Sequence, residues 1–258
     1  MNKLLRKKIV QTITTGGEGH IPSSFSIVDL IDVLYSKHLK FNSTNPTWAE
    51  RDYFVLSKGH GCMALYVVLE KFGFITQSDL DQYGNFDGIL GGHPDRTKVP
   101  GIEASTGSLG HGLPIAVGIA LAHQIRQNEN RVYVLVGDGE CHEGTIWESA
   151  LVAHNLKLNH LCCIVDYNGS AAQIMPHPNI SDQWKSFGWN VLNIDGHTED
   201  EIDKALCTFR SNQNDKPSVI IAKTVKGKGV SFLESHGIWH HKIPNQLEYN
   251  AIIEELDK

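Results

Sequence analysis

Apolar residues follow two periodicities along the chain, and together these predict an α/β fold. Short continuous apolar runs are typical of strands buried on both faces, and apolar residues three or four apart are typical of amphipathic helices. The runs predict strands over 53–56, 132–136, 161–166, 189–194 and 218–222, and the helical spacing predicts helices over 3–15, 26–38, 62–72, 113–127, 143–157, 180–187 and 199–212. Because strands and helices alternate, we expect a parallel sheet with helices on both faces.

Nothing in the sequence divides the chain. It has no internal repeat, no low-complexity tract and no linker-like segment, so we expect residues 1–258 to form one domain with a helical N-terminal start. From about residue 226 the sequence is irregular until a short helix near 248–256. Four basic residues are expected on the solvent face of the first helix: Lys3, Arg6, Lys7 and Lys8.

Composition limits the classes of partner. Hydrophobic residues make up 41% and charged residues 20% of the 258 positions, as in ordinary globular proteins. The net charge of −6 argues against nucleic acid as the main partner. No apolar run approaches the ~18 residues of a membrane span. Five cysteines without a CxxC pair favour reduced thiols over a disulfide framework or a zinc knuckle. We therefore expect a cytoplasmic protein that binds neither nucleic acid nor membrane.

Hard oxygen ligands follow two of the predicted strands. One strand ends at Asp138 between two glycines, and the next strand along the chain is followed by Asn168. Ligands of open α/β sheets bind beyond the carboxyl ends of the strands, where these two side chains can converge if their strands are neighbours. A carboxylate and an amide oxygen, together with a backbone carbonyl and phosphate oxygens, suit Mg²⁺. The flanking glycines permit close approach of a phosphate, and the following helix start favours an anion.

The residues around this site resemble those of the transketolases. GDG followed at this distance by Asn is the thiamine-diphosphate signature, and its surroundings read GDGECHEGTIWESALVAHNLKLNHLCCIVDYN. The similarity extends in the family's order through GEGHIPSSFSIVDLIDVLY, LSKGHG, GGHPDRTKVPGIEASTGSLGHGLPIAVGIALA, KTVKGKGVSF and WHHK. The chain is similar to the first, diphosphate-binding domain of that family, which implies the thiamine-diphosphate-binding fold.

The resemblance implies two bound groups, thiamine diphosphate and Mg²⁺, with Ca²⁺ or Mn²⁺ able to replace the magnesium. Asp138 and Asn168 would ligate the cation, with the carbonyl of Ser170 as the third protein ligand. Seven residues would contact the cofactor: His60, Gly107, Leu109, Gly137, Gly139, Asn168 and His240, with Glu143 acting on it from the interface. His60 and the glycine after Asp138 would meet the diphosphate, and the 107–109 segment would meet the aminopyrimidine.

The resemblance also implies four catalytic residues: His20, His93, Glu143 and His240. The three histidines would surround the reacting carbon and the donor sugar, where neutral imidazoles can donate and accept protons near pH 7. Glu143 would lie at a subunit interface and hydrogen-bond toward the glutamate that activates the aminopyrimidine. An acidic residue here is also typical of a helix start. His241 stands where the family commonly has glycine, and we give it no role.

The chain matches only the first domain of a transketolase. The second domain of the family carries the activating glutamate and the phosphate-binding residues, and 258 residues do not contain it. We therefore expect a split enzyme, in which this chain is inactive alone and acts on a sugar or sugar phosphate with a separate C-terminal subunit, in an α₂β₂ assembly.

Two local departures from the family point to an atypical substrate. The segment after Asn168 reads NGSAAQIMP, which is shorter than usual and places Ser170 where the family has a bulky aliphatic residue. Pro22 and Ser23 follow His20, where split forms often have two glycines. The shorter loop affects the third metal ligand and the wall of the cofactor site.

Other functions remain open at this point. One is a thiamine-diphosphate-dependent synthase that transfers an acyl group from a 2-oxo acid, as the related 1-deoxyxylulose-phosphate synthases do; the three histidines favour a ketose donor instead. Another is a scaffold subunit without turnover, which the intact site residues disfavour. A metal-dependent phosphohydrolase is also compatible with a single GDG, but the clustered ligands it needs are not evident.

Overall fold

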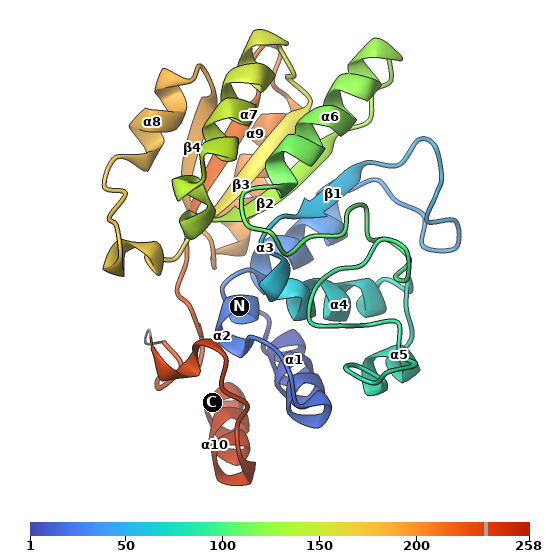
Figure 1. The fold of residues 1–258 in the computed structure, drawn as a ribbon, viewed down its shortest axis with the longest axis vertical. Helices are drawn as coiled ribbons and strands as arrows, with labels where there is room; N and C mark the ends of the chain where they lie inside the picture. The colour runs from blue at the N-terminus through green and yellow to red at the C-terminus, as the bar shows by residue number, and fades with distance from the viewer. Residues whose placement is uncertain (235–236) are drawn as a thin grey trace.

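The computed structural model describes residues 1–234 and 237–258, and its centre is a parallel sheet (Figure 1). The strands are β1 (Tyr53–Leu56), β2 (Val132–Gly137), β3 (Leu161–Tyr167), β4 (Asn190–Asp195) and β5 (Ser218–Lys223). Their order in the sheet is β1-β2-β3-β5-β4, and every pairing is parallel. All five predicted strands are present, with ends that differ from the prediction by one residue at most.

Helices cover both faces of the sheet, as predicted. Successive residues of β2 alternate between two apolar clusters, with Tyr133 and Leu135 in one and Val134 and Val136 in the other. In Figure 1, α6 (Gly112–Ile125) and α7 (Gly144–Asn155) cross in front of the sheet with α8 (Ile180–Ser186) beside them. The opposite face is covered by α3 (Val28–Val33), α4 (Cys62–Lys71) and α9 (Glu199–Arg210). All five cysteines are free.

The predicted helix over 26–38 is wrong in its outline. The segment forms α2 (Ile21–Phe25), α3 and a π-helical turn Leu34–His38. Pro22 favours an earlier start, because proline suits the first turn of a helix. The break at Ser26 turns that hydroxyl inward, where it hydrogen-bonds Asp166 at 2.9 Å. A periodicity of apolar residues does not reveal such a break, since both pieces bury the same kind of face.

Two further helices complete the fold. Helix α5 (Gln77–Asp81) was not predicted, although Thr76 and Asp79 form a capping box at its start. The last helix, α10 (Gln246–Asp257), is longer than predicted and packs against α1 (Lys3–Gly16), away from the sheet. Within the described residues, no helix is long and apolar enough to cross a membrane.

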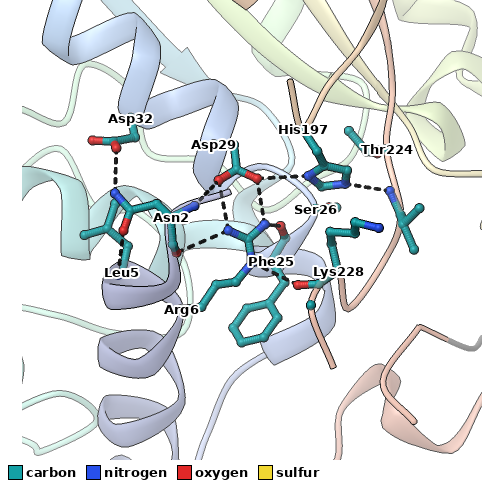
Figure 2. Close-up of polar contacts among 12 residues, drawn as sticks. Asn2, Leu5, Arg6, Phe25, Ser26, Asp29, Asp32, His197, Thr224 and Lys228 are labelled. Carbon is teal, nitrogen blue, oxygen red and sulfur yellow. Dashed lines mark hydrogen bonds and ion pairs between the residues drawn. The ribbon is translucent and has the colours of Figure 1, made fainter. Parts of the chain in front are cut away.

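Arg6 does not lie on the solvent face of α1, contrary to the prediction. Its side chain is fully buried and donates two hydrogen bonds to Asp29, at 2.9 and 2.7 Å, and one to the carbonyl of Lys228 at 2.9 Å (Figure 2). The Asp29 carboxylate also accepts a hydrogen bond from Nδ1 of His197 at 2.9 Å. Burial alone opposes ionisation, but Arg6 and His197 hold the pKa of Asp29 well below its ordinary value.

The same network fixes the segment after β5. The backbone N–H of Val225 donates to Nε2 of His197 at 2.9 Å, so the ring proton of this histidine is on Nδ1. Arg6 and His197 thus hold Lys228 and Val225, the two ends of a short irregular stretch, against α1 and α3. Lys226 lies between these anchors, and its side chain points into the site described next.

Candidate functional site

A cavity of about 560 Å³ opens beyond the carboxyl ends of β1, β2 and β3. Segments from most of the motifs found in the sequence contribute to its walls: GEGHIPSS, SKGHG, TGSLG, GDGECHEG, NGSAAQIMP, KTVKGKG and WHHK. The residues predicted as site residues that line it are His60, Leu109, Gly137, Asp138, Gly139, Asn168, Ser170 and His240. The tertiary structure therefore brings most of the predicted set together.

The two predicted metal-binding side chains follow adjacent strand ends. Gly137 of β2 is in register with Asp166 of β3, so Asp138 and Asn168 emerge side by side. Asp138 is 4% exposed, and burial, with a smaller contribution from the Asp166 carboxylate, raises its pKa. A buried carboxylate with a second acid beside it is a favourable environment for a divalent cation, which would compensate both effects.

Asn168 is oriented by its neighbours. Its Nδ2 donates to Asp166 at 2.8 Å, and its Oδ1 accepts from the backbone N–H of Ser170 at 2.9 Å. Because a carboxylate accepts only, the amide nitrogen must face Asp166 and the oxygen must face the 168–170 turn. The oxygen thus faces the 168–170 turn, and the backbone N–H of Gly169 in that turn hydrogen-bonds the Asp138 carboxylate.

Asp166 is a structural residue of the site that the sequence analysis missed. It is fully buried and accepts hydrogen bonds from Ser26, Lys58, Asn168 and Thr224. Lys58 is 2% exposed and lies 2.5 Å from the carboxylate. Burial opposes ionisation of Asp166, but the charge and hydrogen bond of Lys58 lower its pKa. This buried ion pair joins the end of β1 to the end of β3, and its carboxylate contacts Asn168 of the candidate metal site.

Glu140 is a second missed residue, and it joins three motifs. Its Oε1 accepts from the hydroxyl of Ser57 at 2.5 Å and from the N–H of Gly110 at 2.8 Å, and its Oε2 accepts from the N–H of Gly137 at 2.8 Å. Ser57 in turn accepts from the N–H of Gly112 at 3.0 Å. Burial raises the pKa of Glu140, and these three donors stabilise its charged form. The contacts fix the 107–112 loop relative to the GDG turn.

Four histidines cluster at the mouth of the cavity. The ring centroid of His20 lies 5.3 Å from that of His60, 5.2 Å from that of His240 and 4.7 Å from that of His241. His20 Nδ1 donates to the carbonyl of His240 at 2.8 Å. Burial lowers the pKa of His20 to about 4, and it also lowers the pKa values of His60 and His240. These imidazoles are therefore neutral near pH 7. His241, to which we assigned no role, is part of the cluster.

His93 and the 107–109 loop form the rim on the β1 side. The His93 ring is exposed and packs edge-on against Gly59 and Gly107: a Cβ placed on Gly59 would lie 3.0 Å from its Cδ2, and one on Gly107 would lie 3.2 Å from it. Glycine at both positions permits this close approach. Leu109 is 39% exposed and contributes an apolar group to the cavity wall.

Glu143 lies outside the cavity, at the start of α7. Its side chain is exposed and packs against the backbone of Gly110. A Cβ added to Gly110 would lie 2.6 Å from the Cβ and 2.9 Å from the Cγ of Glu143, so only glycine fits there. Within the described residues its carboxylate makes no capping hydrogen bond to α7, although its position at the N-cap is one where a negative charge favours the helix dipole. An exposed carboxylate beside the 107–112 loop remains available to a partner chain.

Two polar groups that the sequence analysis did not select also face the cavity. The Ser23 hydroxyl is buried and has no hydrogen-bond partner within the described chain. Lys226 donates to Nδ1 of His240 at 2.9 Å, and burial lowers the pKa of its ammonium to about 8. A buried hydroxyl without a partner and a partly buried cation both favour an anionic ligand. Lys226 lies within KTVKGKG and Ser23 stands where split forms often have glycine, so both positions carried a usable signal.

The residues present fit a diphosphate held by a divalent cation. Asp138 and Asn168 supply oxygen ligands, and Lys226 and the Ser23 hydroxyl supply donors. Gly139 leaves open space beside them, since a Cβ there would contact only Ala171, at 3.9 Å.

Comparison with known proteins agrees with this geometry. Residues 1–244 match the family described as transketolase, thiamine diphosphate binding domain. One of the subunits of the apulose-4-phosphate transketolase of Phocaeicola vulgatus is 40% identical over 98% of this chain and 91% of its own length. The 6-deoxy-6-sulfo-D-fructose transketolase subunit SqwG of a Clostridium species is 40% identical over 99% of this chain and 94% of its own length.

Solved structures extend the similarity to the fold. Transketolase from Leishmania mexicana superposes with a TM-score of 0.92 at 28% identity, covering 99% of this chain and 40% of that protein. The chain thus spans nearly all of the subunit relatives but about two fifths of that longer enzyme. The predicted fold class is confirmed.

Proposed function

The chain belongs to the transketolase family, as its thiamine-diphosphate-binding N-terminal domain, and from this membership we propose that it is the N-terminal subunit of a two-chain ketol transferase. The enzyme moves a two-carbon ketol unit from a ketose to an aldose. The observation that supports this most is the placement of the Asp138–Asn168 pair and the neutral histidine cluster at one crevice. Residues 1–258 act as one domain in this proposal, with the cytoplasm as the expected compartment.

The floor of the crevice would hold the cofactor and its cation. Asp138, Asn168 and the carbonyl of Ser170 would supply the oxygen ligands of Mg²⁺. His60, Gly139, Ser23 and Lys226 line the same cavity and would hold the diphosphate. The 107–109 loop, fixed by Glu140, would support the aminopyrimidine.

The histidines handle protons at the substrate. When bound, thiamine diphosphate supplies a nucleophilic carbon that can accept and later release the ketol fragment. His20 and His240 are neutral because they are partly buried, so each can hold or release a proton at a substrate hydroxyl near pH 7. Lys226 donates to His240 Nδ1 and thereby leaves its Nε2–H as the ring's donor. His93, on the rim, contacts the donor sugar.

An exposed apolar face on α6 and α7 fits a partner subunit. Ile115 of α6 and Leu151 and Val152 of α7 are 39%, 50% and 44% exposed, on helices that pack side by side. Two relatives are named as subunits, and each is covered almost completely by this chain. We propose that this face docks a separate C-terminal subunit in an α₂β₂ assembly, with Glu143 at the interface. The crevice is completed only there.

The substrate class is an anionic ketose. The two subunit relatives are named for a sugar phosphate and a sulfo-sugar. The polar residues of the cavity floor here are assigned to the cofactor, so we expect the C-terminal subunit to bind the phosphate or sulfonate group of the substrate. The acyl-transferring and scaffold alternatives have no specific observation in their favour: the histidine cluster suits a hydroxylated donor, and the metal-binding side chains are intact.

Calorimetric titration of thiamine diphosphate with Mg²⁺ tests the proposal, on this chain alone and mixed with its C-terminal subunit. We expect tight binding in the mixture, together with ketol transfer from an anionic ketose and no CO₂ release from pyruvate. Val152→Glu should prevent assembly and leave the thermal stability of the isolated chain unchanged, because the side chain is exposed. Absence of cofactor binding in an assembled complex would overturn the proposal.

A further inference from the structure

In the loop after Asn168, the large apolar side chains at the cofactor crevice come from Ile174 and Met175 and not from the residues directly after the asparagine. Ser170 and Ala171, the first side chains after the glycine, are small. Ile174 and Met175 follow a short 3₁₀ turn, are 94% and 53% exposed, and line the same cavity as Asp138. Exposed apolar side chains at a cavity wall indicate contact with a ligand or partner.

Two histidines fix this loop to the GDG turn. His142 Nε2 donates to the carbonyl of Met175 at 2.9 Å, and the His177 ring donates to the backbone carbonyl of Cys141. The two rings meet edge to face, with centroids 4.4 Å apart. Trp147 stacks on His177 at 6.3 Å and donates from Nε1 to the carbonyl of Cys141 at 2.9 Å. His142 thus holds the backbone of the segment that contains His177, and His177 holds the backbone of the segment that contains His142.

The loop is also anchored at its far end. The hydroxyl of Tyr167, the last residue of β3, donates to the carbonyl of His177 at 3.0 Å. Loop residues 169–177 are therefore fixed at both ends, and His142 fixes the backbone at Met175 between them. Among the described residues, His142 is the side chain outside the loop that hydrogen-bonds the backbone at Met175, next to Ile174, and the N–H groups of Ile174 and Met175 bond the carbonyl of Ala171 within the loop.

We propose that His142 and His177 are positioning residues that hold Ile174 and Met175 as the apolar wall of the cofactor crevice, in place of the aliphatic side chain that Ser170 does not supply. This inference rests on the proposed function, because the cofactor is the ligand that the wall contacts. Neither histidine touches the reacting atoms. Their effect is on the affinity for thiamine diphosphate and on the order of loop 169–177.

Calorimetry on the assembled two-subunit complex, with Mg²⁺ and thiamine diphosphate as the probe, tests this. His142→Ala should weaken cofactor binding about tenfold, the factor that one hydrogen bond of ordinary strength represents. His142→Gln keeps a donor in reach of Met175 and should restore most of the affinity. Ile174→Ser and Met175→Ser should each weaken binding several-fold. Leu247→Ser, on an apolar residue of α10 whose exposure of 80% lies between those of Met175 and Ile174, is the matched control and should have no effect.

Hydrogen exchange of the loop amides supplies a readout that is independent of the cofactor. In His142→Ala, the amides of 169–177 should exchange faster, while those of β2 and β3 stay unchanged. Unchanged exchange, or full cofactor affinity in His142→Ala and Met175→Ser, would overturn the inference and leave the proposed function intact. If the unaltered complex binds no thiamine diphosphate, the proposed function fails and this inference fails with it.

Discussion

The Lys58–Asp166 ion pair gives the sharpest quantitative prediction. Lys58→Met keeps the length and apolar stem of the side chain but removes its charge. Asp166 then remains fully buried with its three other donors, from Ser26, Asn168 and Thr224. Loss of one partner of a buried pair costs about 3–5 kcal/mol, because the remaining charge is uncompensated. For a chain of 258 residues, this corresponds to a melting temperature about 6–9 °C lower.

Thermal and urea unfolding of the isolated chain near pH 7 measure this loss.

The pH dependence of the stability difference gives a second test, because its direction is predicted. In the unaltered chain the pKa of Asp166 is lowered, so its contribution to stability is lost as pH falls through the folded-state value. In Lys58→Met, burial should raise that pKa above the unfolded value, so the variant gains relative stability on acidification. The stability difference between the two proteins should therefore shrink toward pH 4.

The double variant Lys58→Met with Asp166→Asn is the control, since it removes both charges. It should be more stable than Lys58→Met alone. Two results would contradict this prediction: a stability loss below about 1 kcal/mol in Lys58→Met, or a stability difference that is the same at pH 7 and pH 4. Either would mean that Asp166 is not left as an uncompensated buried charge when Lys58 is removed.

Three other contacts give further predictions. Asp138→Asn removes a charged metal ligand, so calorimetry should show Mg²⁺-dependent thiamine diphosphate binding in the complex weakened more than about 100-fold. Thermal unfolding should show a melting temperature within about 2 °C of the unaltered protein, because burial already disfavours the charged form of this carboxylate and raises its pKa. Cofactor affinity should fall as pH rises above 8, by up to about tenfold per pH unit, because the Lys226 ammonium with a pKa of about 8 loses its proton, and Lys226→Met should remove this dependence in titrations from pH 6.5 to 9.5. Glu140→Gln should lower the free energy of unfolding in urea by about 1–3 kcal/mol, because the amide NH₂ of glutamine would face the N–H of Gly137, and two donors cannot hydrogen-bond each other. Unchanged stability would contradict the arrangement in which the side chain of residue 140 accepts from three donors.

The sheet was predictable because its signal is local. The strands β1, β2, β3 and β5 contain continuous apolar runs, and such a run stays recognisable whichever face each residue takes. Asp138 and Asn168 were predictable for a related reason: polar residues that follow buried strands must lie at the sheet's carboxyl edge. The register of Gly137 with Asp166 then brings them together.

The supporting polar residues were not predictable from local pattern. Arg6 looks like an ordinary surface residue of a basic helix, and it is buried because Asp29 of another helix faces it. Glu140 and Asp166 lie within or beside apolar runs, and their importance depends on donors from distant segments such as Ser57 and Ser26. Such residues are recognisable only when the partners are known, since a buried charge without partners would be unfavourable.

The contact between Arg6 and Lys228 has a consequence for how the protein is made. The two residues are separated by 222 positions, yet the Arg6 guanidinium is buried only when Lys228 and Asp29 are both in place. At about 5–20 residues per second, a ribosome needs about 10–45 s to make the intervening chain. During that time α1 has neither its last polar partner nor α10 to pack against. The first helix synthesised is thus among the last to reach its final position, and newly made chains should be most vulnerable to proteases in this interval.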